Sequence, residues 1–231
     1  MFLESIVDTF QDSSELVALC DVSKVRMGVS NRVLEKEYEH APVPAYHADD
    51  FDRMIEQTRP DTVVVTSMDS THHRYIVRAM ELGCDAVTEK PMTIDAEKCN
   101  AILDTVEKTG RTVRVTFNYR WGTFNTKVKE LLEDNAVGPI RSVNLEYLLN
   151  TSHGADYYRR WHSHMACSGG LLVHKSTHHF DLVNWWLDGI PEQVTAYGDL
   201  VFYGKENAVA RGDGKYTRYP RYTGNVTKEE D

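Results

Sequence analysis

The sequence has no long hydrophobic segment and no excess of basic side chains. Its 231 residues contain no apolar run near the roughly 20 residues that cross a bilayer, so we expect no membrane span. Asp and Glu outnumber Lys and Arg by 35 to 26, which gives a formal net charge of −9. Because contact with a phosphate backbone requires clustered basic residues, this balance argues against a nucleic-acid partner.

Cysteines are few and form no recognisable pattern. The four are Cys20, Cys84, Cys99 and Cys167. They are far apart and none has Cys-x-x-Cys spacing, so we expect reduced thiols, three of them in apolar segments of the core. The first ten residues lack the charged and apolar regions of an export signal, and we expect a cytoplasmic protein.

The first half of the chain alternates short apolar runs with amphipathic segments. Strands are predicted at 16–20, 62–66, 86–88 and 113–117, and helices at 48–58, 71–82 and 95–108. The runs are rich in β-branched residues, and the helical segments have apolar residues at i, i+3, i+4 and i+7. Strand–helix alternation with short links predicts an α/β fold, with a Rossmann-type, doubly wound parallel sheet.

The pattern changes after residue 117. Helices are predicted at 124–134 and about 170–187, and strands at 143–149 and about 194–202. Apolar residues alternate along 143–149, which is typical of an antiparallel sheet with one face in solvent. We therefore divide the chain into an α/β domain, 1–117, and part of an α+β domain with a mainly antiparallel sheet, 118–231. We expect a homo-oligomer to form through this second sheet.

Polar residues follow the predicted strands of the first domain. Ser67, Asp69 and His72 come after the second strand, and Glu89-Lys90-Pro91 comes after the third. The carboxyl ends of strands are where open α/β sheets bind ligands. Asp21 ends the first strand, where dinucleotide-binding folds place an acid that hydrogen-bonds the adenosine ribose, although such an aspartate also serves as a turn former or helix cap.

A second group of polar residues lies on the long predicted helix. Gly169-Gly170 is followed by His174, His178 and Asp181 at i, i+4 and i+7, so the three share one helical face. A histidine and a lysine in one cleft can divide the work of oxidising an alcohol. Neutral His178 would accept the hydroxyl proton, and Lys90 would stabilise the developing alkoxide.

Both groups resemble the motifs of the Gfo/Idh/MocA family, named after glucose–fructose oxidoreductase and inositol dehydrogenase. In that family a Thr-Pro-Asn-x-x-His segment opens a helix, a glycine ends it, and Glu-Lys-Pro follows. His72, Gly83 and the tripeptide at 89–91 match in register, whereas Met68 and Asp69 replace the family's Pro and Asn.

The second family motif is Gly-Gly-x3-Asp-x3-His-x2-Asp-x3-Trp. It matches from Gly169 to Trp185, except that His174 replaces the first Asp; we expect His174 to contact substrate or to tune His178. Asn118-Tyr119-Arg120, after the last strand of the first domain, also resembles the family's segment at that place.

The resemblance implies an NAD(P)-dependent oxidoreductase that acts on a sugar, a polyol or a sugar derivative. It also admits enzymes that use nicotinamide transiently in glycoside cleavage. The implied catalytic residues are Lys90, His178 and His174. The implied cofactor contacts are Asp21, Ser67, Asp69, His72, Glu89 and Lys90, and the implied substrate contacts are Lys90, Tyr119, Arg120, His174 and His178. Asp21 favours NAD, because an acid there repels the 2′-phosphate of NADP, which remains possible beside Lys24 and Arg26.

Two other functions are open. His174, His178 and Asp181 could bind zinc in a metal-dependent hydrolase. The helix of such hydrolases, however, carries Glu directly after the first His, where this chain has Lys175, and a cation there opposes a second cation. We therefore expect no metal. The other alternative is a non-catalytic binding protein or subunit.

The family's first strand and its Gly-x-Gly-x-x-Gly loop have no counterpart in the sequence. The amides of that loop hold the cofactor pyrophosphate. We therefore expect the chain to lack both ends of the family fold, and to bind NAD too weakly to work alone. Because the missing strand is central in the family's sheet, we also expect two unpaired inner edges.

Overall fold

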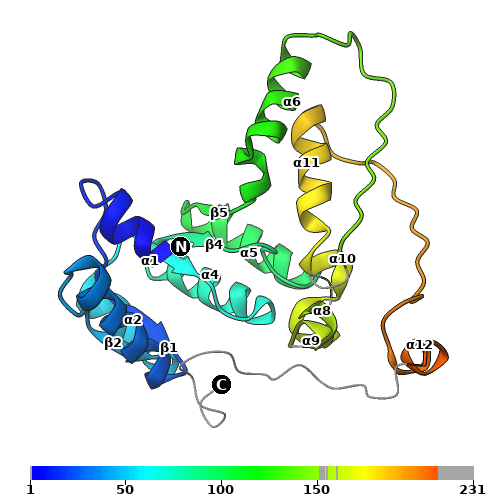
Figure 1. The fold of residues 1–231 in the computed structure, drawn as a ribbon. Helices are drawn as coiled ribbons and strands as arrows, with labels where there is room; N and C mark the ends of the chain where they lie inside the picture. Colours follow the sequence, from blue (N-terminus) through cyan, green and yellow to red (C-terminus); the bar gives the residue numbers. More distant parts are fainter. Residues whose placement is uncertain (1, 151–153, 155, 160, 213–231) are drawn as a thin grey trace.

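The computed structural model describes residues 2–150, 154, 156–159 and 161–212 (Figure 1). Residues 213–231, the end of the second predicted domain, lie outside the described part. Where helices occur among the described residues, none is long and apolar enough to cross a membrane.

Two parallel sheets form the first half of the chain. The strands are β1 (Leu19–Asp21), β2 (Ala45–His47), β3 (Thr62–Val65), β4 (Asp85–Thr88) and β5 (Val113–Val115). β1 pairs with β2, while β3, β4 and β5 pair in that order, with Val64 opposite Val87. The predicted parallel, Rossmann-like α/β fold is confirmed. Within the described residues, β1 pairs with β2 alone and β3 pairs with β4 alone.

Helix α3 (Phe51–Thr58) packs against both sheets. Its buried Phe51, Met54 and Ile55 contact a set of half-buried residues from the two sheets and their neighbours. These are Ala18, Cys20, Tyr46, Val63, Tyr75 and Leu82. The i, i+3, i+4 spacing of the three apolar residues produces this one-sided contact. The smaller sheet is therefore held beside the larger one by side-chain packing.

Helices α4 (His72–Glu81) and α5 (Ala96–Thr109) cover the larger sheet. Ile76, Met80 and Ile102 are almost fully buried against Val65 and Ala86. The Asp95 side chain accepts a hydrogen bond from the backbone N–H of Lys98 and so starts α5. Gly110, with φ of 68°, ends it in the left-handed region that favours glycine.

Helix α2 (Lys24–Tyr38) was not predicted from the sequence. It begins at Ser23, whose side chain accepts a hydrogen bond from the backbone N–H of Arg26. Only Met27 and Leu34 are buried along its 15 residues, so it carries too weak an apolar stripe to be recognised.

The short described elements include α1 (Phe2–Glu4), η1 (Ser5–Thr9), η2 (Ala48–Asp50), η3 (Asp69–Thr71), η4 (Asn118–Trp121), α8 (Asp156–Arg159), η5 (Trp161–Ser163), α9 (Met165–Ser168) and α12 (Lys205–Ala210).

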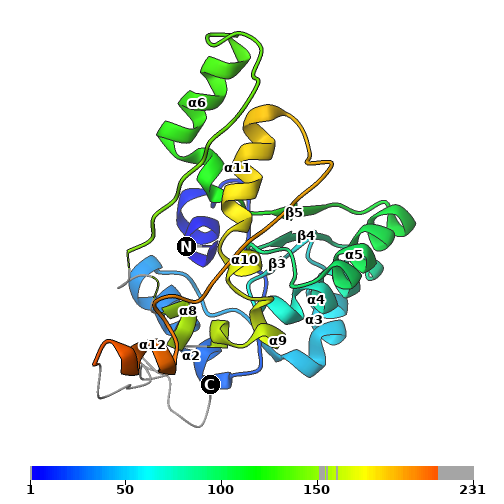
Figure 2. The ribbon, with the colours of Figure 1, turned by 90° about the vertical axis from the view of Figure 1, so that its right-hand side faces the viewer.

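In the second half, α6 (Thr123–Glu133) and α11 (Thr177–Leu187) lie side by side (Figure 2). The predicted helix over 170–187 is interrupted: α10 (Leu171–His174) ends at His174 and α11 begins at Thr177. The prediction of one continuous helix was wrong. Ser176 occupies the N-cap position of α11, in keeping with the preference of serine for helix ends over helix interiors.

The predicted strands at 143–149 and 194–202 were also wrong. Neither segment forms a strand, and the apolar side chains of Val143, Tyr147, Val194 and Tyr197 are exposed. Alternation of apolar residues indicates a face, but a strand also needs a neighbour that satisfies its N–H and C=O groups. No described segment pairs with either stretch, so the antiparallel sheet expected in this half is absent from the part of the chain that the structure covers.

All four cysteines are free, as expected. Cys84 is buried, whereas the other three are only half-buried. Three cysteines were predicted to lie in the core, and only one of them is fully buried.

Candidate active site

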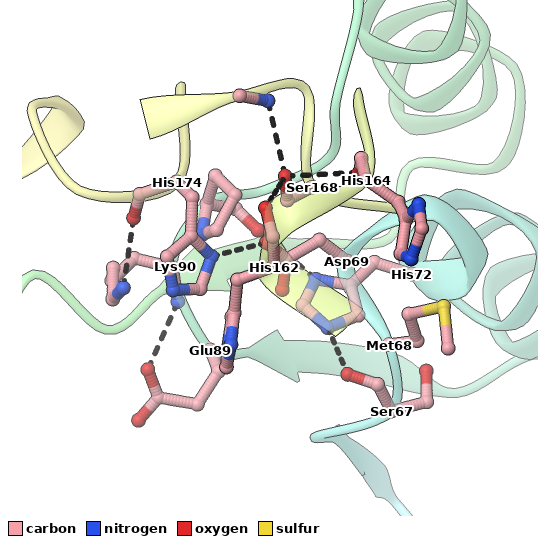
Figure 3. Close-up of polar contacts among 12 residues, drawn as sticks. Ser67, Met68, Asp69, His72, Glu89, Lys90, His162, His164, Ser168 and His174 are labelled. Carbon is pink, nitrogen blue, oxygen red and sulfur yellow. Dashed lines mark hydrogen bonds and ion pairs between the residues drawn. The ribbon is translucent and has the colours of Figure 1, made fainter. Parts of the chain in front are cut away.

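The polar groups predicted in the two halves of the chain meet at the carboxyl edge of the larger sheet. η3 follows β3, the Glu89-Lys90-Pro91 segment follows β4, and both face the segment that contains α9 and α10 (Figure 3). The local order of strand, polar turn and helix therefore positions the first group, and contact between η3 and α9 brings in the second.

His72 connects the loops that follow β3 and β4. The side chain is 1% exposed, with Nδ1 3.0 Å from the carbonyl oxygen of Pro91 and Nε2 2.9 Å from that of Ser67. Its two ring nitrogens are thus used within the protein (Figure 3). His72, predicted to contact the cofactor, fixes the loops that carry Ser67 and Lys90 and so shapes the site.

Lys90 reaches from the first half of the chain into the second. Its ammonium Nζ donates a hydrogen bond of 2.9 Å to the backbone carbonyl oxygen of His174. Burial lowers the pKa of Lys90 below its ordinary value, and the nearby carboxylate of Asp69 opposes this effect. The Glu89 side chain accepts a hydrogen bond from the Lys90 backbone N–H at 3.1 Å, so it braces the segment that carries the lysine.

Asp69 and His174 form a buried ion pair or hydrogen bond across the two halves. Nδ1 of His174 lies 2.5 Å from Oδ2 of Asp69, and the two side chains are only 10% and 5% exposed. Because an ionised carboxylate can only accept, the Nδ1–H of His174 donates. This bond leaves Nε2 as the atom with which the His174 ring can meet another group.

His178 is the second residue of α11 and is also buried. Its ring stacks on that of Tyr119, with centroids 4.0 Å apart and an interplanar angle of 6°. Burial is the largest cause that lowers the pKa of His178 to about 4, and the charges of Lys90 and Lys175 add to it. The ring is therefore neutral near pH 7 and can accept a proton.

Arg120 and Asp181 pair with each other and hold η4 against α11. The Arg120 Nε donates to Oδ2 of Asp181 at 2.8 Å, and a second guanidinium N–H donates to Oδ1 at 2.5 Å. The pair keeps Tyr119, one residue before Arg120, beside His178. With its carboxylate taken by Arg120, Asp181 does not join the two histidines as a ligand. No group of three potential metal ligands occurs in the described residues.

Asp21 is the predicted site residue that does not join this cluster. It ends β1 in the smaller sheet, and its Oδ1 accepts a hydrogen bond of 2.8 Å from the backbone N–H of Ser23. Oδ1 of the aspartate therefore stabilises the turn after β1. The remaining predicted residues either follow strands of the larger sheet or, in the case of His174 and His178, lie in α10 and α11.

Sequence reasoning missed the aromatic and basic side chains that surround the two histidines. His162 stacks on Trp161 and lies 4.5 Å from the His174 ring, centroid to centroid. Lys175 donates a hydrogen bond of 2.7 Å to the hydroxyl of Tyr119. The position of Lys175 between His174 and His178 was a signal that it belongs to the site. From the sequence, this lysine served only as an argument against a metal.

Comparison with known families matches both halves of the chain. Residues 1–117 match the model of an oxidoreductase family with an NAD-binding Rossmann fold, and residues 129–223 match the C-terminal alpha/beta domain of the same family. YteT of Bacillus subtilis (strain 168), named as an oxidoreductase, is 41% identical over 219 residues, which are 94% of this chain and 50% of that protein. An inositol 2-dehydrogenase of Rhizobium meliloti is 29% identical over 59% of this chain and 39% of its own.

Solved structures of the same kind share the fold. Scyllo-inositol dehydrogenase of Lactobacillus casei, with bound NAD(H) and scyllo-inositol, has a TM-score of 0.61 and 22% identity over 80% of this chain and 52% of its own. Aldose-aldose oxidoreductase of Caulobacter crescentus has the same score and identity over 79% of this chain and 53% of its own. The chain spans about half the length of the relatives that it matches.

Proposed function

Because the chain belongs to the Gfo/Idh/MocA oxidoreductase family, we propose that it serves hydride transfer between a nicotinamide cofactor and a sugar, polyol or sugar derivative. The observation that carries this proposal is the contact between Lys90 and the backbone of His174, which brings an ammonium and the two histidines His174 and His178 into one site. Residues 1–117 would bind the cofactor, and residues from 118 onward the substrate.

The residues at the strand ends fit a dinucleotide. Ser67, Glu89 and Lys90 lie at the carboxyl edge of the larger sheet, where α/β folds bind such ligands. The second carboxylate oxygen of Asp21, Oδ2, has no protein partner among the described residues, so it can accept hydrogen bonds from ribose hydroxyls. We propose NAD over NADP, because this acid would repel a 2′-phosphate. When bound, the nicotinamide supplies the hydride acceptor.

The protein side chains would move the proton and stabilise charge. His178, neutral at pH 7 because of its lowered pKa, accepts the proton of the substrate hydroxyl. Lys90 donates a hydrogen bond to the oxygen on which negative charge develops. Tyr119 and the Arg120–Asp181 pair hold the His178 ring in place, so they act as positioning residues, and Tyr119 and Arg120 also border the substrate.

We further propose a cytoplasmic homo-oligomer for the whole protein. Four free cysteines suit a reducing compartment. The exposed apolar residues at 143–149 and 194–202 are supporting observations for an oligomer, because apolar surface of this kind is usually covered by protein. Analytical ultracentrifugation of the whole protein tests the oligomer; a monomer at all concentrations would contradict it.

The test of the function is a screen of the purified whole protein for reduction of NAD with polyols, aldoses and sugar acids. The absorbance of reduced nicotinamide reports turnover, and a Lys90→Met variant serves as the background. Turnover with at least one polyhydroxylated compound, lost in the variant, is the expected result. Activity that persists undiminished in Lys90→Met would contradict the proposed site.

A further inference from the structure

Lys175 is a buried cation that contacts only neutral groups. It lies between α10 and α11 and is 8% exposed. Its ammonium donates to the Tyr119 hydroxyl at 2.7 Å and lies 5.0 Å from the Tyr119 ring centroid and 6.0 Å from that of Tyr147. Among the described residues, no carboxylate forms an ion pair with it.

Other charged side chains of the site have carboxylates beside them. Arg120 forms an ion pair with Asp181, and His174 pairs with Asp69. The carboxylates of Asp69 and Glu89 also lie near Lys90 and favour its charged form. The charge of Lys175, by contrast, acts on neutral bases: burial lowers the pKa values of His178 and His179, and Lys175 adds to this effect.

A buried ammonium without a counter-charge is costly, because the neutral oxygens and ring faces around it replace only part of its hydration. An anion that enters the site would recover this cost through a charge-assisted hydrogen bond. The hydroxyls of Tyr119 and Tyr147 lie 3.4 Å apart beside the ammonium, so they offer further donors to an oxyanion.

We propose that Lys175 binds an oxyanion carried by the substrate, which makes the substrate an acidic carbohydrate. This inference rests on the proposed function and names its substrate class. The acidic group is the carboxylate of a sugar acid or the phosphate of a sugar phosphate; Lys175 offers both the same ammonium. Tyr119 links the two parts of the site, because it contacts Lys175 through its hydroxyl and His178 through its ring. The oxyanion would therefore lie beside the reacting hydroxyl.

The experiment measures binding directly, without turnover. The probes are D-glucuronate, D-glucose 6-phosphate and D-glucose, titrated by calorimetry into the purified whole protein in the presence of NAD. We expect one of the two acids to bind at least about tenfold more tightly than D-glucose, and the arm that binds identifies carboxylate or phosphate. Equal affinity for all three probes, or no binding of either acid, would overturn the proposal.

Variants then assign the preference to one side chain. Lys175→Gln should weaken binding of the acid by about 10- to 100-fold, the loss expected for one charge-assisted hydrogen bond, and leave D-glucose unaffected. Lys175→Arg should keep the preference. The matched control is Lys127→Gln, which removes an exposed lysine that pairs with Glu130 on α6. An acid preference that survives Lys175→Gln would overturn the assignment.

A thermal-shift measurement on the unmodified protein guards against a variant that does not fold. The acid should raise the melting temperature and D-glucose should not. Failure of the proposed function would appear differently, as absence of NAD reduction with every compound while acid binding and its dependence on Lys175 remain. A melting temperature that neither acid changes would count against the anion site itself.

Discussion

The Nδ1 atom of His174 lies 2.5 Å from the Oδ2 atom of Asp69, and this contact joins two positions at which the chain departs from its family's pattern. The family has Asn at the first departure and Asp at the second. Each arrangement therefore has one carboxylate at these two positions. In this chain Asp69 carries it, whereas in the family pattern it is carried by the residue at the position of His174. The two departures are parts of one exchange, which neither motif reveals when read by itself.

The exchange predicts strong coupling between the two positions. Asp69→Asn or His174→Asp alone should lower the free energy of unfolding by about 3 kcal/mol, because each breaks a buried charged pair. The double variant, which recreates the family's residues, should regain all but about 1 kcal/mol. Urea denaturation of the four proteins measures this; additive losses in the double variant would show that the contact has no energetic role. Asp50→Asn, at an exposed ion pair with Arg53, is the control and should cost less than 1 kcal/mol.

Loss of the proton acceptor should reduce turnover. In the whole protein, His178→Ala and Lys90→Ala should each lower kcat by about 10²–10⁴-fold, the range for a positioned acid–base group, with little change in affinity for NAD. Steady-state kinetics and cofactor titration check both parts. His40→Ala, at a histidine whose ring Nδ1 lies 2.7 Å from the backbone oxygen of Ala41, should behave like the unmodified protein. Full turnover in His178→Ala would assign the base elsewhere.

The lowered pKa of His178 predicts how stability depends on pH. The ring has a pKa of about 4 in the folded protein and 6.5 as its ordinary value. As the pH falls from about 6.5 to about 4, the unfolded chain binds a proton that the folded chain does not, so the free energy of unfolding falls. The His178→Gln variant should show a shallower fall over this window when denaturation is followed at several pH values. Because His73 and His179 also have lowered pKa values, the prediction concerns the difference between variant and unmodified protein; parallel curves would contradict it.

The Arg120–Asp181 pair should affect both stability and catalysis. Asp181→Asn keeps the size of the side chain but leaves a half-buried guanidinium without its carboxylate, so unfolding should become easier by about 3 kcal/mol. The weaker hold on Tyr119 should also lower kcat more than it raises KM, since orientation of His178 suffers first. Denaturation and kinetics of one preparation measure both effects. Arg53→Gln removes an exposed ion pair and is the control for stability. A change in KM alone would show that Asp181 contacts substrate instead.

Helices and strands could be predicted from the sequence where the local apolar pattern agrees with the burial of those residues in the fold. β3 and β4 are rich in β-branched residues with buried surroundings, and α4 and α5 have strong apolar stripes, so each was predicted within a few residues. The residues at their ends, from Ser67 to Lys90, were found because strand ends collect ligands in this fold. Lys90 of the first motif contacts the backbone of His174 in the second, and the catalytic role expected of Lys90 stays a prediction.

Other features depend on contacts between distant segments and leave no local pattern. The stripe over 143–149 indicated a strand, yet no described segment lies beside it to complete the hydrogen bonds. The i, i+4, i+7 spacing put Asp181 on one face with the histidines, whereas Arg120, 61 residues away, takes its carboxylate. Lys175 likewise owes its importance to Tyr119, which lies 56 residues earlier.

The packing of α3 against both sheets gives remote residues influence over the cofactor. Asp21 ends a strand of the smaller sheet, and Lys90 follows a strand of the larger one. Binding of a ligand that contacts both residues would therefore depend on the distance between the two sheets. Met54 and Ile55 help to set that distance, because they belong to the apolar cluster that packs against residues of both sheets. A substitution at Met54 or Ile55 would change the distance between the two sheets. The affinity for a long ligand that contacts both sheets would fall, whereas the affinity for a small molecule that contacts one sheet alone would not change.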